Sequence, residues 1–244
     1  MRKRAWAQIV ILLIGIVLLL LSFLIKRNEN GNNNINVVFL SIGCSIISVV
    51  IINYIEYQAA LPERNIIRDV NTWGLISIYK TRSKMNEDAN KLLETAKEFD
   101  LAAFGAKGLI NFKGELIKLR LKQGMVMRIL IPKNKSSFIK QREKDENVKQ
   151  GEIAKTIDDL SIWVKTTKNE LNLDETFLSI KQYSSLPIES IMRIDSDLFV
   201  GPFMVKKVSQ LTIAYRYHKG GEGYDYYYKY FNDIWNDNKI ATSI

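Results

Sequence analysis

Two long runs of apolar residues near the start of the chain constrain its fold more than any other feature. Residues 5–25 carry no charged side chain, and residues 35–55 form a second uncharged apolar run. A helix rises 1.5 Å per residue, so each run reaches about 31 Å, enough to cross the hydrocarbon core of a bilayer. The sequence therefore predicts a two-helix transmembrane hairpin over residues 1–57, with helices at about 5–25 and 35–55.

A cleaved signal peptide is the alternative for the first run, because Arg2, Lys3 and Arg4 resemble the basic start of one. The run is longer than a typical signal peptide core, and the residues that follow it, 26–28, offer no small-residue cleavage site. A retained helix is the interpretation that we favour. In the second run, Gly43, Ser45 and Ser48 permit close helix contact, and the sequence leaves open whether the hairpin anchors the chain or forms a pore.

Positively charged residues lie at both ends of the hairpin. Three of the first four residues are cationic, the polar turn at 26–34 carries two cations, and the segment 63–82 supplies Arg64, Arg68, Lys80 and Arg82. The positive-inside rule then predicts that both termini are cytoplasmic. The single cysteine, Cys44, excludes an intramolecular disulfide and suits a reducing compartment. Richness in Ile, Lys and Asn is typical of AT-rich bacterial genomes, so we expect the bacterial inner membrane.

Residues 58–73 are expected to be a connector, and residues 74–238 a cytoplasmic domain. Period-2 patterns predict strands, and 3.6-residue patterns predict helices. Strands are expected at 74–79, 100–104, 125–131, 177–183, 190–194, 198–200 and 211–215; helices are expected at 86–98, 112–122, 138–164 and 224–236. This alternation predicts an α/β domain with a mixed central sheet flanked by helices.

The composition limits the chemistry. One cysteine and one histidine exclude a cysteine-clustered zinc site and histidine-rich metal sites, so we expect no metal and no cofactor. The glycine-rich segment 220–223 lacks the Gly-Lys-Ser/Thr ending of a phosphate-binding loop and is interpreted as a plain loop. A net charge of +9 permits anionic partners such as nucleotides, nucleic acid or lipid headgroups, without requiring one.

The order of several segments resembles one half of the phospholipase D-like superfamily. The resemblance begins at the strand and arginine turn 74–82, continues through the helix, glycine and strand of 115–131, and includes 186–202 and the final helix 224–235. The resemblance implies an α/β fold with a ligand cleft where two halves meet. Because this chain has one such half, the resemblance also implies a homodimer, with Ile188, Ser190 and Arg193 of both copies lining the cleft.

The motif that carries the chemistry of that family is not intact. Its enzymes use His-x-Lys-x4-Asp, and setting Asp195 at the Asp place puts Ile188 at the His and Ser190 at the Lys. Neither residue supplies an activated nucleophile or a cation, so we expect no catalytic residues. His218 and Asp225 repeat the family's His-to-Asp spacing, but Gly220 stands at the Lys position, and we interpret this as coincidence.

Candidate ligand-binding residues remain. Lys206 and Lys207 supply cations near the strand ends, where open sheets bind ligands. Five of the seven residues 224–230 are tyrosines, which cover every face of a helix, and aromatic rings stack on bases. The candidate residues are Ser190, Arg193, Asp195, Lys206, Lys207, His218, Tyr226 and Tyr230.

These observations favour a non-enzymatic membrane protein that senses a nucleotide or nucleic-acid signal and acts through the hairpin, as a bacterial antiviral-defence effector would. Two alternatives stay open. The first is a membrane-tethered phosphodiesterase or nuclease with an atypical active site. The second is a membrane scaffold that binds a protein partner through the tyrosine helix.

Overall fold

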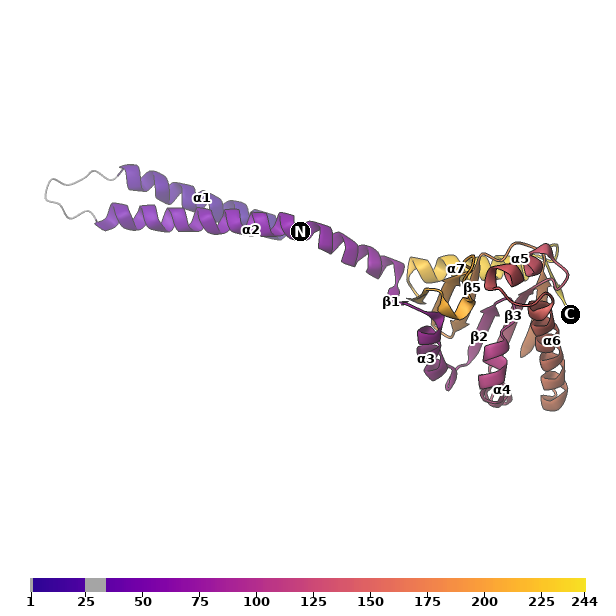
Figure 1. Cartoon of the computed structure of the whole chain (residues 1–244). Helices are drawn as coiled ribbons and strands as arrows, with labels where there is room; N and C mark the ends of the chain where they lie inside the picture. The colour runs from indigo at the N-terminus through magenta and orange to yellow at the C-terminus, as the bar shows by residue number, and fades with distance from the viewer. Residues whose placement is uncertain (1, 25–33) are drawn as a thin grey trace. The chain divides into compact units, whose positions relative to one another are not determined.

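The computed structural model describes residues 2–24 and 34–244, and the chain divides into two compact units, Met1–Arg68 and Asp69–Ile244. In the first unit, α1 (Arg2–Leu24) lies beside the first part of α2 (Asn34–Trp73) (Figure 1). The two helices approach closely at two glycines: a Cβ added to Gly43 would lie 3.0 Å from the carbonyl oxygen of Gly15. The expected turn at 26–34 lies outside the described residues, apart from Asn34.

One described helix, over Ile35–Trp73, is long and apolar enough to cross a membrane, and Gln8–Leu24 is a shorter apolar helix. Their large apolar side chains are mostly exposed, since little protein covers them. The expected connector, 58–73, is helical. It forms the C-terminal part of α2, which continues through Pro62.

The second unit is built on one eight-stranded mixed sheet, which confirms the predicted fold class. The strand order is β1-β7-β6-β5-β2-β3-β4-β8. The neighbours β2–β3 and β3–β4 are parallel, and the other adjacent pairs are antiparallel. The strands are β1 (Leu75–Tyr79), β2 (Glu98–Ala102), β3 (Val126–Pro132), β4 (Leu178–Tyr183), β5 (Glu189–Ile194), β6 (Asp197–Pro202), β7 (Ala214–His218) and β8 (Ala241–Ser243).

Helices cover both faces of the sheet (Figure 1). The larger core lies under α3 (Arg82–Leu93), α4 (Lys107–Lys122), α5 (Ser137–Glu146) and α6 (Glu152–Leu171), whose apolar residues recur at helical spacing and meet one sheet face. The smaller core lies between the other face and α7 (Glu222–Asn236), and it includes Phe231, Ile234 and Leu130. A 3-10 turn, η1 (Ser209–Leu211), precedes β7.

Several expected boundaries are wrong. The helix expected at 86–98 begins earlier, because Thr81 caps α3 by accepting a hydrogen bond from the Lys84 amide. The helix expected at 138–164 is two helices, separated where Asn147 and Gly151 adopt left-handed backbone conformations. The strand expected at 211–215 begins at Ala214 instead, and β8 was not expected at all.

Candidate functional site

Five strands of the sheet end at the same edge. Strands β2, β3 and β4 are parallel. β5 is antiparallel to both β2 and β6, and β7 is antiparallel to both β6 and β1. Strands β1, β2, β3, β4 and β6 therefore all run in one direction. We call the edge where these five strands end the carboxyl edge, and the opposite one the amino edge. Ligands of open α/β sheets bind beyond the carboxyl ends of the strands.

Arg82 is buried at the carboxyl edge, where β1 turns into α3. Its residue is 6% exposed, and its Nη2 donates to the carbonyl oxygens of Gly201 (2.6 Å) and Pro202 (2.8 Å). Its guanidinium lies over the Phe203 ring, 5.0 Å from the centroid. The Nε of Arg82 is buried without a hydrogen-bond partner among the described residues. Gly201 makes room for it, since a Cβ there would lie 2.7 Å from that Nε.

A second buried arginine, Arg142 of α5, contacts the same aromatic ring. It is 3% exposed, and its guanidinium lies 5.1 Å from the centroid of Phe203. Unlike Arg82, it has a carboxylate partner, because its Nε donates to Glu146 Oε1 at 2.9 Å. Glu146 also accepts hydrogen bonds from the amide and the hydroxyl of Ser209. We call Arg82, Phe203 and Arg142 the arginine cluster.

The charge of Arg82 is not balanced by a direct contact with a carboxylate among the described residues. Burial and the nearby Arg142 charge lower the pKa of Arg82 to about 10, so the group still keeps its proton at neutral pH. Two carboxylates, Glu146 and Glu189 at the start of β5, act in the opposite direction and raise the pKa of Arg82 through their charge. Burial raises the pKa of Glu189, against the lowering effects of the Tyr227 side chain and the Arg82 charge. A buried cation without a direct anionic partner is a costly arrangement, and binding an anion would relieve it.

Three of the expected site residues lie at or beside this edge. Ser190 is on β5, and its hydroxyl donates to the Gly201 carbonyl oxygen at 3.3 Å. Lys206 and Lys207 follow β6 and are exposed, with Lys206 in a left-handed conformation. Ile188, the residue just before β5, is 61% exposed.

Asp195 and His218 lie at the amino edge instead. Asp195 occupies the β5–β6 turn at φ 50° and accepts hydrogen bonds from the amides of Lys97 and Glu98, which joins this turn to the start of β2. His218 pairs with the first residue of β6, whereas Ser190 pairs with Gly201 four residues further along. At about 3.3 Å per residue, His218 and Ser190 are roughly 13 Å apart along the direction of the strands. The structure therefore does not bring His218 to the arginine cluster.

Arg193 is held between the sheet and α7, on the sheet face opposite Ser190. Its Nε donates to Asp100 Oδ2 at 2.5 Å, and its Nη1 donates to Glu98 Oε2 at 2.6 Å. Arg128 of β3 donates two hydrogen bonds, of 2.6 and 2.8 Å, to the same Asp100 carboxylate. Arg193, Asp100 and Arg128 thus form an ion triad across β5, β2 and β3. Arg193 is 5% exposed, and its hydrogen bonds in the described structure go to other residues of the same unit.

The tyrosine-rich helix covers this triad. The Tyr228 ring lies 4.8 Å from the Arg193 guanidinium, and Phe231 and Trp235 stack on Arg128. Tyr230 is half-buried in the smaller core, whereas Tyr226 is 65% exposed and contacts Tyr227 edge-on. Most of these rings therefore pack on the sheet, and Tyr226 is the tyrosine of α7 that solvent reaches most.

Comparison with known protein families finds one family whose model matches this chain. The family described as a domain of unknown function (DUF5919) matches residues 73–209, more than half of the chain. The chain belongs to this family. The matched region contains all three residues of the arginine cluster and ends before β7 and α7. A comparison with curated proteins finds no match.

Solved structures give weaker likenesses. TrmBL2, an archaeal chromatin protein with a novel mode of DNA binding, aligns with a TM-score of 0.43 and 12% identity, over 86% of this chain and 70% of its own. Phosphatidylserine synthase of Haemophilus influenzae Rd KW20 aligns with a TM-score of 0.46 and 10% identity, over 73% of this chain and 42% of its own. Both scores lie below 0.5, and neither likeness indicates a function for this chain.

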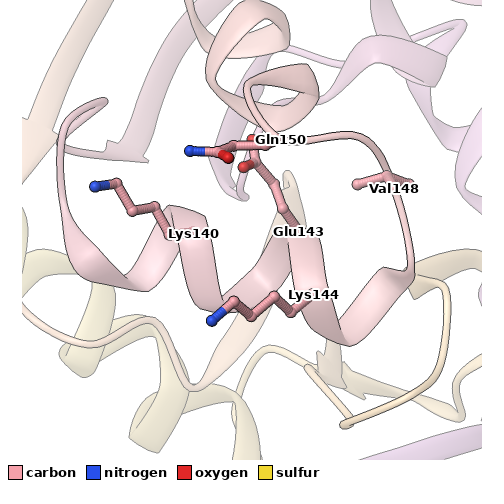
Figure 2. Close-up of a pocket in the computed structure, with 5 residues that line it drawn as sticks. All are labelled: Lys140, Glu143, Lys144, Val148 and Gln150. Carbon is pink, nitrogen blue, oxygen red and sulfur yellow. The ribbon is translucent and has the colours of Figure 1, made fainter.

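The charge-rich segment 140–149 is partly buried. Glu143 is 3% exposed because it caps α6, accepting hydrogen bonds from the amides of Gly151 and Ile153 at 3.0 Å. Beside it is a pocket of about 370 Å³, lined by α5 and the loop that joins α5 to α6. Figure 2 shows Glu143 reaching toward Gln150, while Lys140 and Lys144 extend away from the carboxylate. With Glu143 already committed to the helix, this pocket is a weaker candidate site than the carboxyl edge.

The arginine cluster was not among the residues selected from the sequence. Arg82 was considered only for its charge and as part of an arginine turn, and Arg142 lay in a charge-rich helix that resembles a solvated surface. No local pattern marks a buried arginine, since its burial depends on strands distant in the sequence. Among the described residues, no group of three or more His, Cys, Asp or Glu side chains is arranged to hold a metal ion.

Proposed function

We propose that this protein is a membrane-anchored, non-enzymatic sensor whose α/β unit binds a phosphate-bearing ligand, a nucleotide or nucleic acid, at the carboxyl edge. The observation that carries the proposal is Arg82, which is 6% exposed and whose guanidinium has no carboxylate in direct contact among the described residues. Arginine is well suited to phosphate, because its fork of donors matches phosphate oxygens.

The order of segments in the sequence supports a further proposal, that the unit is a degenerate half of the phospholipase D-like superfamily. In that case the carboxyl edges of two copies would face each other in a homodimer. The replacement of the family's His and Lys by Ile188 and Ser190 supports binding without hydrolysis. Hydrolysis of a generic phosphodiester by the purified protein, lost in His218→Ala, would instead support the enzyme alternative.

Contacts at the end of α2 support a signalling route to the membrane segment. The last residues of α2, from Asp69 onward, belong to the second unit. There the backbone of Trp73 and Gly74 lies against Gly221 and Gly223 at the start of α7, and the His218 amide donates to the Gly74 carbonyl oxygen at 2.9 Å. Because α2 is also the helix long enough to span a membrane, a change in the second unit would reach that helix directly.

The ligand is tested by thermal shift of the full-length protein in detergent, against nucleotides, cyclic oligonucleotides and short single-stranded DNA. A ligand at 100 times its Kd stabilises the folded state by about 2.7 kcal/mol, so binding is readable as a higher Tm. We expect at least one phosphate-bearing ligand to raise Tm. No shift across the panel, together with a stable protein partner lost in Tyr226→Ala, would support the scaffold alternative.

Replacing Arg82 with glutamine is expected to weaken that binding about 10- to 100-fold, since a hydrogen bond to a charged group contributes about 1.5–3 kcal/mol. Lys84→Gln is the matched control. It removes one positive charge two residues further along α3, from a side chain that is 70% exposed. Calorimetric titration of both variants measures the difference. Equal affinity in the Arg82→Gln and Lys84→Gln variants would contradict the assignment of the site.

The proposed action through the hairpin, as in a bacterial antiviral effector, is tested in cells. Induced expression of the full-length protein, with the ligand supplied, is expected to depolarise the inner membrane. A chain lacking residues 1–58 is expected to leave the potential unchanged. A voltage-sensitive dye measures both strains. An unchanged potential in the full-length strain would remove the effector hypothesis and leave ligand binding itself intact.

A further inference from the structure

The loop that follows β6 displays apolar and basic side chains together. Over residues 204–211, Val205 is 68% exposed and Leu211 is 63% exposed, and Met204 and Val208 are each more than 40% exposed. Lys206 and Lys207 lie between them, and the segment 203–211 contains no acidic residue. Apolar side chains that stay in water forgo the stabilisation that burial would give. A group of them on one folded loop therefore indicates a surface that binds a partner.

The loop is held in this conformation by polar contacts with α5. Arg142 donates to the carbonyl oxygens of Met204 (2.9 Å) and Lys207 (3.1 Å) and to the hydroxyl of Ser209 (3.0 Å). These contacts turn the backbone of the loop toward the buried guanidinium. Lys206, between the two carbonyl groups, takes a left-handed conformation at φ 58°. The apolar and basic side chains at the tip are thus displayed by a preorganised loop.

A second exposed apolar segment lies beside the loop. The Phe203 amide donates to the Ile188 carbonyl oxygen at 3.2 Å, which joins the start of the loop to the segment before β5. Ile188 is 61% exposed, and Leu186, two residues earlier, is 57% exposed. We call the exposed residues of 186–188 and 204–211 the edge surface.

We infer that the edge surface docks on an anionic lipid bilayer. Surfaces that bind at the membrane interface combine apolar side chains, which enter the headgroup region, with lysines, which are attracted to anionic lipids. The edge surface has both, and the same chain carries a helix long and apolar enough to span a membrane. This inference does not depend on the phosphate ligand proposed above, and it is an alternative to the homodimer proposed there, in which a second copy would cover the same edge.

A second copy fits this surface less well. A two-fold contact places the same patch on both partners, so Lys206 and Lys207 of one copy would lie close to the same lysines of the other. Juxtaposed like charges disfavour such a contact, and the loop has no acidic residue to compensate. The lipid surface supplies the negative charge that a copy of the loop cannot supply.

The test uses the full-length protein reconstituted in vesicles without nucleotide. In a Cys44→Ser background, Val205→Cys carries an environment-sensitive fluorophore. We expect blue-shifted emission and protection from an aqueous quencher in vesicles containing phosphatidylglycerol, but not in vesicles of phosphatidylcholine alone. Leu119→Cys is the matched control, because Leu119 is apolar, 51% exposed and on α4, outside the edge surface; its emission should be the same in both lipids.

The charge dependence completes the test. Each lysine near an anionic surface strengthens binding by about fivefold, so Lys206→Gln with Lys207→Gln should raise the phosphatidylglycerol content needed for the half-maximal shift. Emission of the Val205 probe that is the same in both lipids would overturn the inference. A shift in phosphatidylcholine that grows with protein density would also overturn it, since that result identifies a second copy as the occupant.

Discussion

Replacing Asp100 with alanine is expected to lower the free energy of unfolding of the α/β unit by about 3–5 kcal/mol, the cost of leaving buried charges unpaired. Asp100 is 2% exposed and is the carboxylate shared by Arg193 and Arg128. Burial alone would lower the pKa of Arg193, but the Asp100 charge and hydrogen bond hold that pKa above its ordinary value. Without Asp100, both guanidinium groups would stay beneath α7, and one of them would keep only Glu98 as a carboxylate partner.

Urea unfolding of the full-length protein in detergent, followed by tryptophan fluorescence, measures the change. Asp233→Ala is the matched control. Asp233 also pairs with a cation, Lys229, but that pair is 60–75% exposed, so its loss should cost less than about 1 kcal/mol. Similar losses in the two variants would show that the ion triad does not hold the sheet to α7.

Replacing Gly221 with alanine is expected to destabilise the same unit by about 3 kcal/mol, at the upper end of overpacking costs. The added Cβ would lie 2.4 Å from the Gly74 Cα and 2.6 Å from the Trp73 carbonyl oxygen. Both neighbours are backbone atoms, so no side-chain rotation relieves the clash. The end of α2 would have to move away from the start of α7.

Gly108→Ala is the control for this substitution. Gly108 lies in α4, a Cβ there meets nothing within 4 Å, and its φ is helical. Alanine should therefore stabilise the unit by up to about 1 kcal/mol, the opposite sign. Thermal unfolding of the two variants under the same conditions measures both effects. A Gly221→Ala protein as stable as the Gly108→Ala protein would disprove the close backbone contact.

Local sequence patterns predicted most of the elements of the second unit. β3 and β5 were found because apolar residues alternate or run together between clear turn signals, and the helix expected at 224–236 matches α7 to within two residues. The break between α5 and α6 was missed, because a left-handed asparagine such as Asn147 has no strong local signature. β8 pairs with β4 in the register Lys181↔Ser243, which joins residues 62 positions apart, and no local pattern encodes such a pairing.

The candidate site was predicted less well for a related reason. Arg193 was expected to line a cleft, and in the structure it lies on the face of β5 opposite Ile194. The sequence could not show that α7 covers that face, nor that Asp100 from another strand meets Arg193 there. Arg82 and Arg142 were overlooked because charged residues are most often exposed, and their burial is set by Phe203 and by carbonyl groups of distant segments.

The central claim is that Arg82 provides an anion site at the carboxyl edge, and binding of ATP and of short oligothymidylate tests it most directly. Calorimetric titration of the full-length protein, its Arg82→Lys variant and its Lys84→Gln control compares the affinities. We predict saturable binding of at least one of these probes, retained in the control and weakened in Arg82→Lys, because lysine keeps the charge but loses the fork of donors. Binding that is equal in all three proteins, or absent from a folded wild-type protein, would contradict the account.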